Sequence, residues 1–183
     1  ECGFNSLEMC DGMFAFIIYD IEKNKLILAR DRIGKKPIYL YKNKKQIFIA
    51  SELNTFKNLI PNLSINESSI SSFLRVGFFH ESSTPFKDIE EILPGHMYEI
   101  NISSLKISSF RYFNIIDQYE KPISISHEEA LLELDSILKK SVKDRLLSSD
   151  LDVGTFLSSG IDSSLIVAIA SQYVEKIKTF TVK

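Results

Sequence analysis

The hydrophobic residues in the first part of the chain fall in short bursts separated by polar connections. Each burst is about four to eight residues long and rich in Ile, Phe and Tyr, which is typical of β-strands. The polar segments at 20–25 and 42–45 are short enough to close antiparallel hairpins. We therefore expect an antiparallel meander over about residues 12–51, with strands at Met13–Tyr19, Leu26–Ala29, Ile38–Tyr41 and Ile47–Ala50.

Two small helices are expected next, at Leu53–Leu59 and Glu67–Val76, because their apolar residues recur on one face. Residues 77–94 show no clean period and include two prolines, which predicts an irregular connector. Alternation then returns at 95–100 and 107–113, where we expect a final pair of strands.

The character of the chain changes near residue 120. Ser126 and Glu129 form the pattern of a capping box, which predicts the start of a long helix that ends around Leu147. A β-loop-α-β unit should follow, and the strands of such a unit are expected to be parallel with a right-handed crossover. Its elements are a strand at 153–157, a Ser/Gly turn, a helix from about Asp162 to Val174 and a strand at 177–182.

Composition narrows the classes of function. The chain has 183 residues, of which 44% are hydrophobic and 25% charged, as in globular proteins. A net charge of -2 gives no basic surface for nucleic acid and no polybasic patch for a membrane. The longest apolar run is far shorter than the roughly 20 residues of a membrane span, and no signal-peptide pattern opens the chain, so a cytoplasmic protein is expected. Because it starts at Glu1 and ends within a strand-like segment, we expect a fragment.

The turn between the last predicted strand pair carries the clearest chemistry. A strand that ends in small residues and leads into a helix gathers unpaired backbone N–H groups where the helix dipole favours an anion, and phosphate fits such a site. No Lys follows Gly160, so the G-x-x-x-x-G-K-[ST] loop of kinases and GTPases is absent. For the isolated pattern, a plain turn with Asp162 as helix cap remains an equal alternative.

Residues 149–164, SDLDVGTFLSSGIDSS, are similar to the SDVPVGxFLSGGLDSS stretch of the asparagine synthetase family. Asp152 stands where that family usually has Pro, and Ser159 where it usually has Gly. Earlier segments look like the later strands and closing hairpin of the family's glutaminase domain, namely 12–20, 29–39, 50–52, 93–96 and 112–113.

The resemblance implies an α+β fold for residues 1–120, the C-terminal half of an antiparallel Ntn-hydrolase-type glutaminase sandwich (class II glutamine amidotransferase). Residues 121–183 would then begin an α/β ATP-pyrophosphatase domain of the adenine-nucleotide α-hydrolase-like (PP-loop) type. The intact protein would be a carbon–nitrogen ligase that uses ATP and Mg²⁺ to adenylate aspartate. Ammonia from glutamine would then give asparagine, AMP and pyrophosphate, and a homodimer is compatible with this family.

The resemblance also assigns ligand-binding positions. Leu157 and Val182 match positions whose backbone flanks adenine, and Asp162 is the candidate to face Mg²⁺ carried by the pyrophosphate. No catalytic residue is expected within the chain, because the nucleophilic Cys should lie upstream, so the fragment alone should be inactive. The residues expected to hold pyrophosphate are Ser158, Ser159, Gly160, Asp162, Ser163 and Ser164.

Two alternatives stay open. The first is a relative with the same ATP loop and another acceptor, such as a β-lactam precursor or a surface sugar. The second is a degenerate, non-catalytic copy kept for subunit interaction, suggested by Ser159 and Asp152. If the position of Ser159 needs positive φ, a serine there would strain the loop.

Other polar residues are expected to be structural. Cys2 resembles an N-terminal amidotransferase nucleophile, but Glu1 blocks the amine that such a residue uses, and the strand at Met13 follows too soon. The Arg30-Asp31-Arg32 segment predicts a charged turn or domain-interface element, and His96 a hairpin residue with no catalytic partner at a suggestive spacing.

Overall fold

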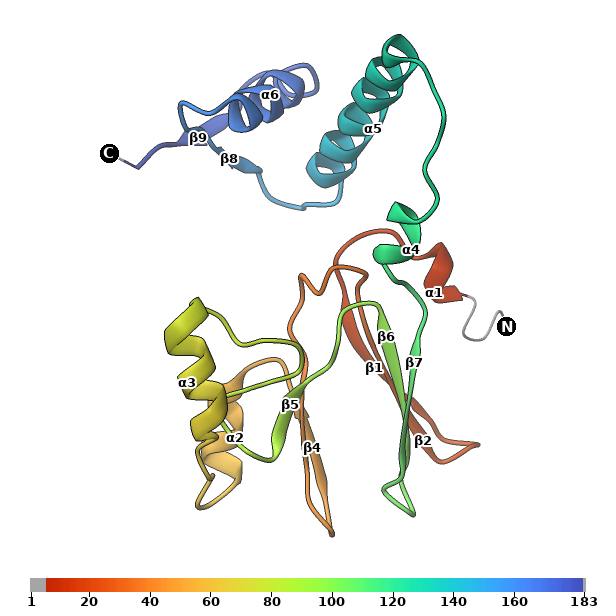
Figure 1. Ribbon diagram of the computed structural model, residues 1–183, viewed down its shortest axis with the longest axis vertical. Helices are drawn as coiled ribbons and strands as arrows, with labels where there is room; N and C mark the ends of the chain where they lie inside the picture. Colours follow the sequence, from red (N-terminus) through yellow and green to blue (C-terminus); the bar gives the residue numbers. More distant parts are fainter. Residues whose placement is uncertain (1–5, 183) are drawn as a thin grey trace. The chain divides into compact units, whose positions relative to one another are not determined.

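The computed structural model describes residues 6–182 and divides into two compact units, Glu1–Lys121 and Pro122–Lys183. Figure 1 shows the elements of both units. Among the described residues, no helix is long and apolar enough to cross a membrane.

The first unit contains two antiparallel sheets. One has four strands in the order β1-β2-β6-β7, and the other has three in the order β4-β3-β5. The four-stranded sheet consists of β1 (Ala15–Asp20), β2 (Lys25–Arg30), β6 (His96–Asn101) and β7 (Ile107–Arg111). The smaller sheet consists of β3 (Tyr39–Lys42), β4 (Ile47–Ala50) and β5 (Ile89–Glu91).

The expected meander over residues 12–51 is wrong, although each of its four strands forms. The strand β2 pairs with β6, with Leu28 opposite Tyr98, whereas β3 pairs with β4 and β5 in the other sheet. The segment between β2 and β3 thus carries the chain from one sheet to the other. Hydrophobic periodicity identifies strands but not their partners, so a pairing between strands far apart in sequence was not visible.

The helices of the first unit are short. The expected helices form as α2 (Leu53–Leu59) and α3 (Glu67–Val76), and α3 begins where the Asn66 side chain accepts from the Ser69 N–H. Two further helices, α1 (Ser6–Met9) and α4 (Ile116–Tyr119), were not predicted, and neither was β5. Elements of three or four residues are too short to show a period.

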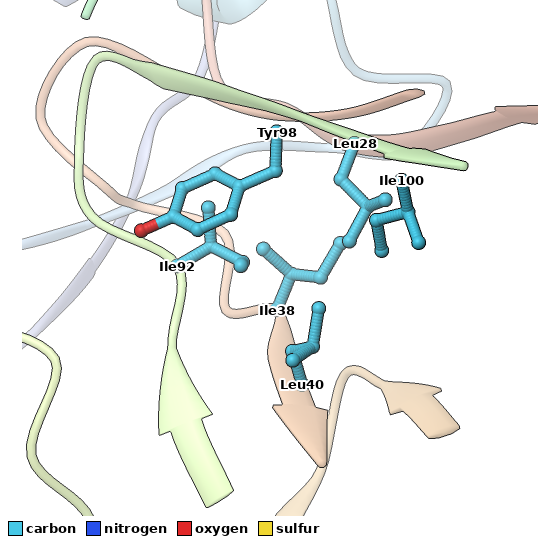
Figure 2. Close-up of a cluster of buried hydrophobic side chains, with 6 residues drawn as sticks. All are labelled: Leu28, Ile38, Leu40, Ile92, Tyr98 and Ile100. Carbon is cyan, nitrogen blue, oxygen red and sulfur yellow. The ribbon is translucent and has the colours of Figure 1, made fainter. Parts of the chain in front are cut away.

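The main core joins the two sheets of the first unit. Leu28, Tyr98 and Ile100 come from the four-stranded sheet, and residues at or beside β3 and β5 meet them. Figure 2 shows these side chains directed toward one another. The cluster consists of Leu28, Ile38, Leu40, Ile92, Tyr98 and Ile100. Burial of each large apolar side chain contributes about 1.5–3 kcal/mol, so this cluster fixes how the sheets pack.

The second unit begins with α5 (His127–Leu147). The predicted capping box is confirmed, because the Ser126 hydroxyl accepts from the Glu129 N–H and the Glu129 carboxylate accepts from the Ser126 N–H. The hydrogen bonds that the Glu129 carboxylate accepts from the Ser126 N–H and hydroxyl lower the pKa of Glu129. The cap therefore determines where α5 starts.

The rest of the second unit is the expected β-α-β arrangement. The strands β8 (Gly154–Phe156) and β9 (Lys178–Phe180) pair in parallel, and α6 (Ile161–Ala170) connects them. The prediction that α6 extends to Val174 is wrong, since it ends at Ala170 in a turn where the Ser171 hydroxyl donates to the Ala168 carbonyl. Ile169 and Ala170 pack with Val142 of α5 in a small core.

Replacing Thr155 by Val is expected to stabilise the second unit. The Thr155 hydroxyl oxygen in β8 is buried and has no hydrogen-bond partner among residues 6–182. Valine has nearly the same shape and removes the buried polar atom, so the free energy of unfolding should rise by about 1 kcal/mol. Urea denaturation measures the change, with Thr179→Val on exposed β9 as the control. A stability loss in the Thr155 variant alone would show that the hydroxyl has a partner.

Candidate functional site

The Ser158–Ser164 loop follows the end of β8 and includes the first turn of α6, and the residue before it, Leu157, is fixed to β9. The Leu157 N–H donates to the Phe180 carbonyl at 2.9 Å, and the Thr181 hydroxyl donates to the Leu157 carbonyl at 2.7 Å. Ligands of open parallel sheets bind beyond the carboxyl ends of the strands, which is where this loop lies.

Serine hydroxyls close the Ser158–Ser164 loop on itself. The Ser163 hydroxyl oxygen accepts from the Ser158 N–H at 3.1 Å and lies 2.8 Å from the Ser158 hydroxyl oxygen. The Ser158 oxygen also accepts from the Gly160 N–H at 3.2 Å, and the Ser164 hydroxyl donates to the Gly160 carbonyl at 2.9 Å. These bonds hold the backbone in one shape before any ligand arrives.

Several donors of the loop remain unused. Gly160 is the N-cap of α6 and supplies no side-chain cap. Within the described part of the chain, the N–H groups of Ile161, Asp162 and Ser163 therefore have no protein acceptor. They point out of the first turn of a helix, where the dipole is positive, so the loop can bind an anion.

Ser159 fits its position without backbone strain. Among residues 6–182, the only non-glycine residues with positive φ are Asn24, Asn62, Glu81 and Leu105. Gly160 itself has φ -79°. The position of Ser159 does not require glycine for its backbone conformation, so one reason to regard the loop as degenerate is removed.

Asp152, the other departure from the family pattern, has a structural role. Its carboxylate lies 2.8 Å from the Lys178 ammonium, and this hydrogen bond and charge lower the pKa of Asp152. Since Lys178 is the first residue of β9 and pairs with Gly154 of β8, the contact joins the two strands at their amino ends. Asp152 is therefore remote from the Ser158–Ser164 loop along the strands.

The remaining predicted ligand residues lie around the loop. Leu157 is half-buried and both of its backbone groups are engaged, whereas Val182 lies exposed just after β9. Asp162 is exposed in the first turn of α6. Within residues 6–182 no cluster of three metal-ligating side chains forms, so a Mg²⁺ ion would need oxygens from its phosphate ligand in addition to Asp162.

The neighbouring residues Arg30 and Asp31 of the first unit have a structural role. This agrees with the charged turn, one of the two interpretations of this segment from the sequence. Asp31 is 2% exposed and accepts from four backbone N–H groups. Arg30 donates to three carbonyls and forms an ion pair with Glu91 at 2.7 Å. These contacts hold the segment between β2 and β3.

The other predicted structural residues can be placed only in part. His96 opens β6, and its Nδ1 contacts the Pro94 carbonyl at 2.8 Å, as suits a hairpin residue. Cys2 lies outside the described residues. Sequence reasoning missed Tyr112, whose hydroxyl donates to the Arg30 carbonyl at 2.6 Å. No spacing in the sequence indicates this contact between the last residue of β2 and the residue that follows β7.

Two families match the chain. Residues 1–113 match the glutamine amidotransferase domain, and residues 133–183 match asparagine synthase. The antiparallel unit therefore belongs to the glutamine amidotransferase domain family. The β-α-β unit is the start of an asparagine synthase domain, so the chain joins parts of both.

Curated relatives agree with this assignment. "Asparagine synthetase [glutamine-hydrolyzing] 1" of Bacillus subtilis is 31% identical over 93% of this chain and 26% of its own length. "Asparagine synthetase [glutamine-hydrolyzing] 3" of the same organism is 34% identical over 91% of this chain, again 26% of its length. A putative asparagine synthetase of Methanocaldococcus jannaschii is 28% identical over the full chain and 36% of its own length. The chain thus spans about a quarter to a third of these relatives.

A solved glutamine phosphoribosylpyrophosphate amidotransferase from B. subtilis covers 97% of this chain at 20% identity. Its TM-score is 0.35 and the chain covers 34% of it, so it adds nothing to the family assignment.

Proposed function

We propose that the chain is part of a glutamine-dependent asparagine synthetase and that its Ser158–Ser164 loop holds the pyrophosphate of ATP. The observation that carries the proposal is the set of unused N–H groups of Ile161, Asp162 and Ser163. They lie at the end of a parallel strand pair, in a segment that matches the asparagine synthase family. A polyanion is the ligand that this arrangement suits.

The reaction has two steps. A carboxylate oxygen of aspartate attacks the α-phosphorus of ATP, and the bond to pyrophosphate breaks, which gives an acyl adenylate. Ammonia released from glutamine then attacks the acyl carbon, AMP leaves with the bonding electrons, and the amide forms. The α6 N–H groups and the Ser159 hydroxyl would stabilise the negative charge that develops on pyrophosphate, and the internal serine bonds keep these donors in place.

Mg²⁺ fits this site as a companion of the phosphates. The exposed Asp162 carboxylate supplies a hard oxygen ligand beside the anion-binding N–H groups. When bound, the ion would neutralise phosphate charge. Asp162 would orient it, and the backbone would bind the phosphate oxygens.

The unstrained conformation of Ser159 supports an active loop over a degenerate copy. In addition, the relatives that resemble the chain are named asparagine synthetases, which favours aspartate as the acceptor over a sugar or a β-lactam precursor. The first point rests on the backbone of this chain, and the second on its likeness to those proteins.

Isothermal titration of the chain with magnesium pyrophosphate and with MgATP tests the loop. Ser158→Ala removes the bond that Ser158 accepts from the Gly160 N–H and its contact with Ser163, so binding should weaken about tenfold. Ser171→Ala, at the other end of α6, is the matched control and should bind as the native chain does. Ser159→Gly should leave the affinity within about threefold.

A loop transplant tests whether the loop supports catalysis when the rest of the enzyme is known to be active. Residues 149–164 would replace the corresponding segment of the 31% identical B. subtilis synthetase, and asparagine formation would be measured. Retained synthesis is expected. Loss of synthesis that Ser159→Gly restores would establish the degenerate-copy alternative. Absence of pyrophosphate binding in both the native chain and the Ser159 variant would overturn the proposed role of the loop.

A further inference from the structure

A hollow of about 420 Å³ lies on the first unit. It is formed where α1, the segment after β2, the end of β7 and α4 come together, and Figure 1 shows α1 and α4 beside one another. We call it the Arg32 pocket. Its size suits a small molecule. The lining residues are Glu8, Arg32, Tyr112, Phe113 and Gln118.

Arg32 is a fixed cation with donors to spare. One of its nitrogens donates to the Glu8 carbonyl at 2.8 Å, and its guanidinium lies 5.4 Å from the centre of the Phe113 ring. Unlike Arg30, which is paired with Glu91, Arg32 has no carboxylate partner among residues 6–182. A guanidinium has five N–H donors, so most of those of Arg32 can bind a ligand carboxylate.

An acidic residue, Glu8, also lines the Arg32 pocket. The Glu8 side chain is exposed, and within the described chain no cation forms an ion pair with it. Gln118 adds an amide that both donates and accepts. A simple inorganic anion would meet repulsion from Glu8, whereas a ligand with separated positive and negative charges would find a partner for each.

One of the two aromatic residues that line the pocket, Tyr112, is held in place by a hydrogen bond to β2. The Tyr112 hydroxyl donates to the Arg30 carbonyl at 2.6 Å. Burial, together with the nearby Asp31 carboxylate, raises the pKa of Tyr112 to about 12, so the hydroxyl remains a donor at neutral pH. The ring orientation is therefore set before a ligand binds.

We propose that the Arg32 pocket binds a free α-amino acid, with the ligand carboxylate on Arg32, its ammonium on Glu8 and its side chain against Phe113. Gln118 favours a side chain that ends in an amide, which makes L-asparagine the suitable probe. The site goes beyond the proposed ATP chemistry and does not depend on it, because every lining residue belongs to the first unit.

Titration of the chain with L-asparagine and two analogues tests both charges. N-acetyl-L-asparagine lacks the ammonium, and L-aspartamide lacks the carboxylate. Each should bind at least about tenfold more weakly than L-asparagine. In Glu8→Gln the penalty for the acetyl analogue should disappear, and in Arg32→Gln the penalty for the diamide should disappear. Arg75→Gln on α3 removes an arginine charge elsewhere in the unit and should change neither penalty.

Equal binding of the three compounds, or phosphate binding as strong as that of L-asparagine, would overturn the proposal, as would no binding at all. Thermal melting shows whether each variant folds. Should Arg32→Gln unfold, Glu8→Gln decides, since the Glu8 contact with Arg32 uses only its backbone carbonyl. Failure here leaves the pyrophosphate titration of the second unit unaffected.

Discussion

Replacing Asp31 by Ala should lower the free energy of unfolding of the first unit by about 3–5 kcal/mol. The Asp31 carboxylate is 2% exposed and accepts from the N–H groups of Phe14, Ile33, Lys35 and Lys36. Alanine leaves these donors without an acceptor in a place that little water reaches. Because Phe14 precedes β1 and the others lie between β2 and β3, the loss should loosen both sheets.

The same carboxylate gives the first unit a predictable response to acid. Burial raises the pKa of Asp31, but the four N–H donors outweigh it and hold the pKa below its ordinary value of 3.8. The folded state therefore binds the proton less tightly than the unfolded state does. The stability that Asp31 contributes is complete above pH 3.8 and is lost as the pH falls through the lower folded value.

Urea denaturation at several pH values, with hydrogen exchange to follow the first unit, measures both effects. Asp20→Ala is the matched control, because Asp20 also accepts a backbone hydrogen bond, from Lys23, but lies at the end of β1, where its carboxylate accepts fewer N–H groups and is more accessible to water than that of Asp31. It should change stability little. An equal loss in both variants, or an acid response unchanged by the removal of Asp31, would contradict the assigned role.

The sequence could reveal those parts of the fold that depend on residues close together along the chain. The hydrophobic pattern located the strands other than β5, and the Ser126–Glu129 spacing located the start of α5, because both depend on neighbours in sequence. The sheet partners of β2 and the burial of Asp31 depend on β6 and on the crossing between sheets. Those contacts are long-range, so the meander was the simplest expectation and was wrong.

The candidate site, too, was predictable from the sequence only in part. The motif at 149–164 identified the loop, and the structure places Ser158 and Ser163 in contact within it. Whether Ser159 strains the loop could not be read from its identity, since φ is set by the geometry between β8 and α6. The Arg32 pocket was not predicted either, because α1 and α4 carry no periodic pattern and meet only through folding.

Gly95→Ala should destabilise the first unit by roughly 2–5 kcal/mol, through backbone strain and overpacking together. Gly95 has φ +65°, and a Cβ there would lie 2.5 Å from the Phe113 carbonyl oxygen. That oxygen belongs to the backbone and cannot rotate away. Moreover, the Gly95 carbonyl accepts from the Tyr112 and Phe113 N–H groups, and its N–H donates to the Asp31 carbonyl.

The Gly77→Ala variant measures the cost of the left-handed backbone without the steric clash that Gly95→Ala adds. Gly77 has φ +82°, but nothing lies within 4 Å of the position that an alanine methyl group would take there, so only the left-handed backbone opposes the change, at about 1–2 kcal/mol. Urea denaturation of the two variants should therefore give a clearly larger loss for Gly95. Equal losses would mean that the Phe113 segment moves aside freely. In that case hydrogen exchange at Tyr112 and Phe113 should rise in the Gly95 variant, because the bonds that tie the end of β7 to the Asp31 turn would have opened.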